Sequence, residues 1–177
     1  HPLESPKAAY FSVFQDGEAC RMFYRASPRD MPDMICTMTS ADGKSWKRPE
    51  LGLFDFQGSK NNNIVWNDQR ARTDHMFAPF KDTRPGVPDD ERYKALAGSP
   101  IHALASPDGI RWRLLSEKPV LTGANFDSLN LAFWDAERGH YRLYCRHRLE
   151  GDIRFIATAT SKDFLHWSER VPIDTGD

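Results

Sequence analysis

Three titratable side chains stand just before apolar, strand-like segments of the sequence: Glu4, His75 and Asp127. Asp127 is flanked by Phe126 and Leu129, so we expect its carboxyl group to be partly desolvated, which suits proton transfer. Two such carboxylates across a channel are the apparatus of glycoside hydrolysis. One protonates the leaving oxygen, and the other attacks the anomeric carbon or activates water. The sequence therefore identifies Asp127, Glu4 and His75 as candidate catalytic residues.

A second group of side chains could bind a sugar. The predicted binding residues are Asn62, Asn63, Trp66, Asn130 and Arg146. The amides could hydrogen-bond hydroxyl groups, the indole could stack on a sugar ring, and the guanidinium could hold hydroxyls or a carboxylate.

All of these residues have structural alternatives. Asp127 could cap a turn, His75 could satisfy a buried hydrogen bond, and Glu4 could be disordered, as terminal residues often are. Trp66 could be a core residue, and Arg146 could lie on a solvated rim. The sequence alone leaves both interpretations open.

The elements that would position these side chains come from a repeat. Three segments share the pattern Ser-x-Asp, then Gly or Phe, two further residues and Trp: Ser40–Trp46, Ser106–Trp112 and Ser161–Trp167. An Asp-Gly pair suits a tight turn because it tolerates positive φ. We expect Asp42, Asp108 and Asp163 to be turn residues and the three tryptophans to be core residues.

Two strand-like segments precede each copy of the repeat. They are residues 10–14 and 20–25 before the first copy, 76–80 and 92–97 before the second, and 129–134 and 141–146 before the third. We therefore expect each repeat, together with its two preceding segments, to form a four-stranded antiparallel meander. Repeated sheets of this kind are typical of β-propellers. We predict an all-β fold with a single propeller domain over residues 1–177. The predicted blades cover residues 8–56, 75–121 and 127–174, with an insertion at 57–74. This insertion could be a turn followed by a short edge strand, or a polar loop over the propeller face that offers amide groups to a sugar.

Composition argues against several kinds of partner. The chain has 177 residues, a formal net charge of −1 and evenly spread Lys and Arg, so no basic patch indicates nucleic acid. No apolar run approaches the roughly 18 residues that a membrane helix needs. The sequence opens with His1 and Pro2 rather than a Met and a leader, so we expect any export signal to have been removed or never to have existed. The compartment stays open, with export as one option.

Three cysteines, Cys20, Cys36 and Cys145, are too few and too scattered for a disulfide scaffold or a zinc site. Each lies in an apolar, strand-like run, which favours a buried free thiol. A Cys20–Cys36 bridge stays open because their strands should be neighbours. No metal site is predicted.

Four segments together carry a family resemblance: Asn61–Val65, Arg92–Gly98, Phe126–Asp135 and Thr160–Trp167. They resemble the five-bladed β-propeller glycoside hydrolases, and more narrowly an uncharacterised bacterial branch related to the invertase/levanase and arabinanase/xylosidase families. The resemblance extends from about Tyr10 to Thr175. It implies a five-bladed propeller that hydrolyses glycosidic bonds in an oligo- or polysaccharide.

The resemblance also implies residue roles. In those families a first-blade aspartate is the nucleophile or base, a second- or third-blade aspartate orients the sugar, and a glutamate is the acid. Asp127 matches a third inner-strand acid, His75 matches a polar residue at the mouth of the second blade, and Glu4 stands roughly where the first-blade acid is expected. Some arabinanase-like propellers hold calcium, but this sequence shows no compact loop of oxygen ligands, so no cofactor is expected.

Two other functions fit the same repeat. Blades without catalysis could present a polar face to a carbohydrate or a protein. A sialidase-like propeller would need an arginine cluster for the carboxylate of its substrate, and Arg21, Arg25 and Arg146 are the candidates.

The number of blades bears on the whole protein. Closed propellers have about four to eight blades, so three leave open sheet edges and uncovered apolar faces. We therefore expect the chain to be part of a longer protein or to close its ring by association with other copies.

Overall fold

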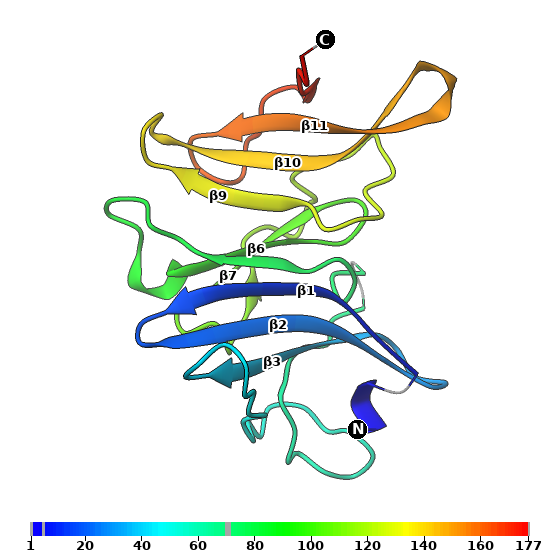
Figure 1. Ribbon diagram of the computed structural model, residues 1–177, viewed down its shortest axis with the longest axis vertical. Coiled ribbons are helices and arrows are strands. Elements are labelled where there is room, and N and C mark those ends of the chain that lie inside the picture. Colours follow the sequence, from blue (N-terminus) through cyan, green and yellow to red (C-terminus); the bar gives the residue numbers. More distant parts are fainter. Residues whose placement is uncertain (1, 5, 70–71, 177) are drawn as a thin grey trace.

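The computed structural model describes residues 2–4, 6–69 and 72–176. It contains three antiparallel sheets of four strands each, which confirms the predicted all-β fold with about three propeller blades. Figure 1 shows the sheets stacked one above another, with the first in blue at the bottom, the second in green and the third in yellow and orange at the top. No helix in the described part of the chain is long and apolar enough to cross a membrane.

Within each sheet the strands follow one another in sequence order. The first sheet contains β1 (Pro6–Asp16), β2 (Ala19–Pro28), β3 (Met34–Ser40) and β4 (Ile64–Trp66). The second contains β5 (Ala78–Lys81), β6 (Tyr93–Ala97), β7 (His102–Ser106) and β8 (Arg113–Leu114). The third contains β9 (Leu131–Asp135), β10 (His140–Leu149), β11 (Ile153–Ser161) and β12 (Val171–Pro172). Short 3-10 helices are η1 (Pro2–Glu4), η2 (Asp89–Glu91) and η3 (Glu150–Asp152).

The Ser-x-Asp pattern forms the same turn after the third strand of every sheet. In the second sheet, Ser106 Oγ accepts a hydrogen bond from the Gly109 N–H at 2.9 Å. Asp108 Oδ1 accepts from the N–H groups of Ile110 and Arg111, both at 2.8 Å. The first and third sheets repeat these bonds at the corresponding positions. The predicted turn role of the three aspartates is therefore confirmed.

The residue after each turn aspartate has a left-handed backbone, with φ of 71° at Gly43, 72° at Gly109 and 70° at Phe164. Glycine adopts this conformation without steric cost, but phenylalanine does not. The Phe164 ring is fully buried, with its centroid 5.1 Å from that of Tyr141 and 5.6 Å from that of Phe80. Burial of this aromatic side chain offsets the backbone strain.

The three repeated tryptophans differ in burial. Trp112 is buried, with its ring centroid 6.0 Å from that of Phe23 and 4.9 Å from that of Phe77. Trp46 and Trp167 are half-buried. The predicted core role therefore holds most fully for Trp112.

Apolar cores between the sheets hold the three blades together. The core between the first and second sheets includes Phe23, Ile35, Ala95 and Leu104, and the core between the second and third includes Leu96, Ala103, Ala132 and Leu143. Because the second sheet is covered on both faces, every residue of β6 and β7 is buried.

A buried ion pair of the second sheet is also hydrogen-bonded to the third sheet. Lys94 Nζ lies 2.9 Å from Asp82 Oδ2, and the Tyr141 hydroxyl donates to the same oxygen at 2.6 Å. Both charged side chains are almost completely buried, so each depends on the other for its stability in the interior.

The prediction for the first blade was wrong about its fourth strand. That strand, β4, lies inside residues 57–74, which the sequence predicts as an insertion, and not before residue 57. After the Asp-Gly turn, Lys47 pairs with Thr39 only as an isolated bridge. Pro49 cannot donate to a ladder and Gly52 has a φ of 70°, so the chain leaves the sheet here and returns later.

The open Cys20–Cys36 bridge is also not formed, and both thiols are free. Their strands are neighbours, as predicted, but the register places Cys20 opposite Ser40 and Cys36 opposite Tyr24. The two sulfur atoms are therefore too far apart along the strands for a disulfide.

Candidate active site

The connections of an antiparallel sheet alternate between its two ends. The Ser-x-Asp turns and the β1–β2 turn lie at one end of the blades, which we call the turn end. The β2–β3 loop and the connections between sheets lie at the other, which we call the site end. The site end carries a set of side chains that we call the polar cluster: Tyr10, Arg25, Asp33, Asp74, His75, Asp127 and Arg146.

Tyr10 lies at the centre of the polar cluster. Its hydroxyl donates to Asp127 Oδ1 at 3.5 Å, and its ring meets the His75 ring edge-on, with the centroids 5.6 Å apart. The Arg25 guanidinium carbon lies 4.7 Å from the centroid of the same ring. A bulge in β1 gives Tyr10 a φ of 56°, a strained conformation for a residue other than glycine.

Two carboxylates flank this ring from different sheets. Asp33 Oδ2 lies 3.5 Å from Arg25 Nη1 and 3.9 Å from His75 Nε2. On the other side, Asp127 Oδ2 lies 3.5 Å from Arg146 Nη1, which also donates to the Asp127 carbonyl oxygen at 3.0 Å. Asp127 is 56% exposed, so the predicted desolvation of this carboxyl is wrong. It is accessible to a ligand instead.

Burial and neighbouring charge shift two adjacent groups in opposite directions. Burial, assisted by the nearby Asp33 carboxylate, raises the pKa of Asp74 from 3.8 to about 6. Burial and the Arg25 guanidinium lower the pKa of His75 below its usual value of 6.5. The cluster therefore holds a carboxyl group that keeps its proton into the mildly acidic range and an imidazole that is neutral at pH 7.

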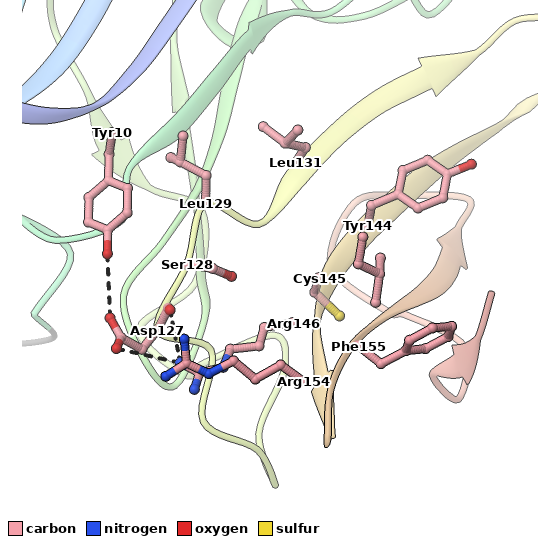
Figure 2. A pocket seen from close by; sticks show the side chains of 11 residues that line it. Tyr10, Asp127, Ser128, Leu129, Leu131, Tyr144, Cys145, Arg146, Arg154 and Phe155 are labelled. Atoms are coloured by element: carbon pink, nitrogen blue, oxygen red, sulfur yellow. Dashed lines mark hydrogen bonds and ion pairs between the residues drawn. The ribbon is translucent and has the colours of Figure 1, made fainter. Parts of the chain in front are cut away.

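A cavity of about 530 Å³ opens beside the polar cluster. Figure 2 shows Asp127, Arg146 and Arg154 at one side of it, with Tyr10 bonded to Asp127. Apolar side chains from the third sheet complete the lining: Leu129, Leu131, Phe155 and Ile156. The cavity thus combines an apolar wall with polar groups at one edge, as is common in small-molecule sites.

The structure brings together two of the three predicted catalytic residues, Asp127 and His75. Glu4 is not with them. Its carboxylate accepts hydrogen bonds from the Tyr24 hydroxyl at 2.6 Å and from Arg48 Nε and Nη2 at 3.1 Å. Tyr24 lies on the face of β2 that points away from the second sheet, so Glu4 is a structural ion-pair partner there.

The predicted binding residues of the first sheet have structural contacts. Asn62 Nδ2 donates to the carbonyl oxygens of Phe54 and Ser59. Asn63 is buried, and its amide donates to Thr37 and Tyr24. Trp66 is buried with Nε1 bonded to Thr73 Oγ1 at 2.9 Å. None of these three residues lines the cavity.

The predicted binding residues of the third sheet lie at the site. Arg146 lines the cavity. Asn130 is buried beneath it, where its amide donates to the Phe126 carbonyl at 3.0 Å and the Ser128 carbonyl at 2.9 Å. Asn130 therefore shapes the loop that carries Asp127.

Sequence reasoning missed Tyr10, Asp33 and Asp74 as site residues, and it considered Arg25 only for a sialidase. The position of Asp33 in the predicted meander could have identified it as a site residue. It lies in the loop between the second and third strands, which an antiparallel meander places at the same end as Asp74, His75 and Asp127.

The arginine set expected of a sialidase is not assembled. Arg25 and Arg146 are at the site end, but Arg21 bonds Asp16 and the Asp108 carbonyl at the turn end. Among the described residues, no group of three or more His, Cys, Asp or Glu side chains is arranged to hold a metal ion.

No protein-family model and no curated protein sequence matches this chain. Solved structures do match. A glycosyl hydrolase from Bacteroides ovatus has a TM-score of 0.63 and 16% identity, over 98% of this chain and 56% of that chain. A second match is a structure from the GH130 family of mannoside phosphorylases, a family that contains glycoside hydrolases that target β-1,2 mannosidic linkages in Candida mannan. Its TM-score is 0.63 and its sequence identity is 14%, over 96% of this chain and 52% of that chain.

A third match is an N-acetylgalactosamine deacetylase from F. plautii in complex with blood group B trisaccharide, with a TM-score of 0.65 and 13% identity over 94% of this chain and 53% of that chain. Identities this low show a shared fold. The chain spans about half the length of the solved structures it matches. The three sheets of this chain therefore share the fold of about half of each of these glycoside hydrolase-like structures.

Proposed function

We propose that this chain carries part of a carbohydrate-active site that hydrolyses glycosidic bonds by paired-carboxylate chemistry. The observation that carries the proposal is the approach of Asp127 to Tyr10 and of Asp33 to His75, beside a cavity that Tyr10 and Asp127 line. Asp74 precedes His75 in the chain and is near enough to Asp33 for that carboxylate to raise its pKa. These three carboxylates come from separate connections of the fold. Solved structures that share the fold of this chain include a glycosyl hydrolase and a member of a family that contains glycoside hydrolases.

In this proposal the acid and the base are different aspartates. Asp127 is exposed at the edge of the cavity, where its carboxylate can attack the anomeric carbon or take a proton from water. Asp74 is the proton donor, since its raised pKa keeps the carboxyl protonated up to about pH 6. His75 and Tyr10 lie between the two sides of the cluster and fix their arrangement. Glu4 has no part in this chemistry.

The substitution Asp127→Asn tests the proposal. A panel of aryl glycosides should include at least one that the unaltered protein cleaves, and the variant should lower kcat/KM for it by about 10²- to 10⁴-fold. Asp42→Asn, a substitution at an exposed turn aspartate, is the matched control and should leave kcat/KM unchanged.

Two outcomes would overturn the assignment. Full activity of Asp127→Asn would remove this residue from the chemistry. Sugar binding without cleavage of any glycoside would favour the alternative of a non-catalytic binding propeller. Thermal unfolding of both variants should show that any loss of activity is not a loss of fold.

The outer face of the third sheet is uncovered and largely apolar, whereas the outer face of the first sheet is covered in part by Leu3 and Phe56 and exposes apolar side chains on β1. Their most exposed large side chains are Phe11, Val13, Leu131, Phe133, Tyr144, Ile156 and Val171. The inner faces of the same sheets are covered by neighbouring blades. We propose that, when the chain is alone in solution, a second copy of it covers the part of these faces that lies outside the cavity, around Phe11, Val13, Phe133 and Val171.

Sedimentation velocity tests this association. The unaltered chain should form dimers or larger species, and Phe133→Asp should shift it toward the monomer, whereas Glu137→Gln should not. A monodisperse monomer of the unaltered chain would contradict the proposal.

A further inference from the structure

The end of the β10–β11 hairpin gathers four guanidinium groups, which we call the arginine patch: Arg146, Arg148, Arg154 and Arg170. Arg148 and Arg154 face each other across the strand pair, and Arg146 is two residues before Arg148 on the same face of β10. Arg146 and Arg154 line the 530 Å³ cavity. Arg146, Arg148 and Arg170 line a second cavity of about 250 Å³ next to it.

The arginine patch has more positive charge than its carboxylates neutralise. Arg146 is 3.5 Å from Asp127 Oδ2, and Arg148 is 2.7 Å from Asp152 Oδ1. Within the described ranges, neither Arg154 nor Arg170 has a carboxylate partner. The patch therefore has a local excess of two positive charges, with Arg154 at the 530 Å³ cavity and Arg170 at the smaller one, in a chain whose formal net charge is −1.

Hydrogen bonding within the patch is also incomplete. Arg146 Nε and Arg170 Nη1 are buried without a hydrogen-bond partner among the described residues. Arg154 is exposed, and the structure gives its guanidinium no hydrogen bond to any described residue. Guanidinium groups bind carboxylates through paired N–H donors, and this geometry is more selective than a point charge.

We propose that the 530 Å³ cavity binds an acidic sugar, with the carboxylate of a uronic acid held by Arg154 and Arg146. The apolar wall formed by Leu131 and Tyr144 would contact the carbon–hydrogen face of the ring. Because Arg146 and Asp127 offset each other, the net attraction for the ligand carboxylate would come from Arg154, and Arg146 would add hydrogen-bond donors. This proposal rests on the proposed function only in taking the ligand to be a carbohydrate.

Ligand titration followed by NMR tests the proposal with defined probes. The probes are the methyl glycosides of glucuronate and galacturonate, their neutral glucose and galactose counterparts, and glucose 6-sulfate. At least one uronide should bind about tenfold more tightly than its neutral counterpart, which corresponds to about 1.4 kcal/mol. This preference should weaken as salt is added.

The substitution Arg154→Gln should remove the preference for the charged sugar, so that the uronide and its neutral counterpart bind with similar affinity. Arg138→Gln is the matched control, because Arg138 is an exposed arginine of the same sheet that pairs with Asp135, away from the cavity. The control should keep the preference in full.

The outcomes separate this proposal from the proposed function. Equal affinity for charged and neutral sugars, or a preference that survives Arg154→Gln, would overturn the acidic-sugar site even if glycosides are cleaved. Preferential uronide binding without cleavage of any glycoside would support the site and count against hydrolysis. Tighter binding of glucose 6-sulfate than of either uronide would overturn the uronic acid in favour of a sulfated sugar.

Discussion

The turn end and the site end of the blades use aspartate in opposite ways. At the turn end, Asp42, Asp108 and Asp163 accept hydrogen bonds from backbone N–H groups of their own turns. At the site end, Asp33 Oδ2 lies 3.9 Å from His75 Nε2, and Asp127 Oδ1 accepts a hydrogen bond from the Tyr10 hydroxyl at 3.5 Å, so both meet side chains from another blade. The first group is satisfied locally, whereas the second keeps capacity to bind a ligand.

The pKa values follow the same division. Burial opposes ionisation of Asp108, but backbone N–H donors from Arg111 and Ile110 outweigh it and lower the pKa of this carboxyl. Burial raises the pKa of Asp74, and the negative charge of Asp33 adds to the shift. Regular spacing of acids in a repeat therefore marks structural turns, and the irregular acids of the connections are the chemically available ones.

The largest effect on stability should come from the turn end. Asp108→Ala leaves the N–H groups of Ile110 and Arg111 without an acceptor, so we expect the free energy of unfolding to fall by about 2 to 3 kcal/mol. Urea denaturation measures this change. Asp127→Ala at the exposed site should change it by less than about 0.5 kcal/mol. Equal losses in the free energy of unfolding for the two variants would contradict the distinction between structural aspartates at the turn end and available aspartates at the site end.

The second-largest expected effect is a pH dependence of the free energy of unfolding that comes from Asp74. Its pKa is about 6 in the folded chain and near 3.8 when unfolded, so the folded state holds a proton that the unfolded state releases between these values. The contribution of Asp74 to the free energy of unfolding should therefore fall by about 2 kcal/mol as pH rises from about 4 to 6, whereas carboxyls with lowered pKa values, such as Asp16 and Asp108, contribute the opposite slope.

The substitution Asp74→Asn should remove this slope, so that the variant is more stable than the unaltered protein at pH 7 and similar to it at pH 3.5. Glu137→Gln, at an exposed carboxylate, is the control and should keep the slope. Denaturant midpoints measured across this pH range would show the difference. An unchanged slope in Asp74→Asn would mean that Asp74 is not the buried acid of the site.

The smallest effect should come from Tyr10→Phe. The Tyr10 hydroxyl donates only one long hydrogen bond, at 3.5 Å, so its loss should change stability by less than about 0.5 kcal/mol. The site should respond more clearly, with KM for a cleaved glycoside rising about two- to threefold. Steady-state kinetics measures this, and a large loss of stability would place Tyr10 with the structural residues of the turn end.

The repeat could be predicted because each of its features is local. Ser106, Asp108 and Gly109 form their turn from neighbouring residues, so spacing alone identifies it. The fourth strand of the first sheet could not be placed in this way. Residues 47–63 leave the sheet before Ile64 returns to pair with Cys36, and that choice depends on the space beside β3.

The candidate site was predictable only in part. His75 and Asp127 precede inner strands, where propellers place their ligands, so their position along the chain points to the site. Glu4 satisfies the same rule, yet the structure pairs it with Arg48 and Tyr24 on the far face of the first sheet. Asp33 sits in an ordinary loop and shows its role only through its distance from His75.

The sequence by itself determines the all-β class, the three turns and the sheets that they connect, because turn chemistry and strand periodicity act over a few residues. Only the tertiary structure decides which acids meet. The separation of Asp127 from Tyr10, and of Asp33 from His75, depends on how whole blades stack and on the bulge that turns Tyr10. Stacking is set by apolar cores whose contacts are far apart along the chain, and no local pattern encodes those distances.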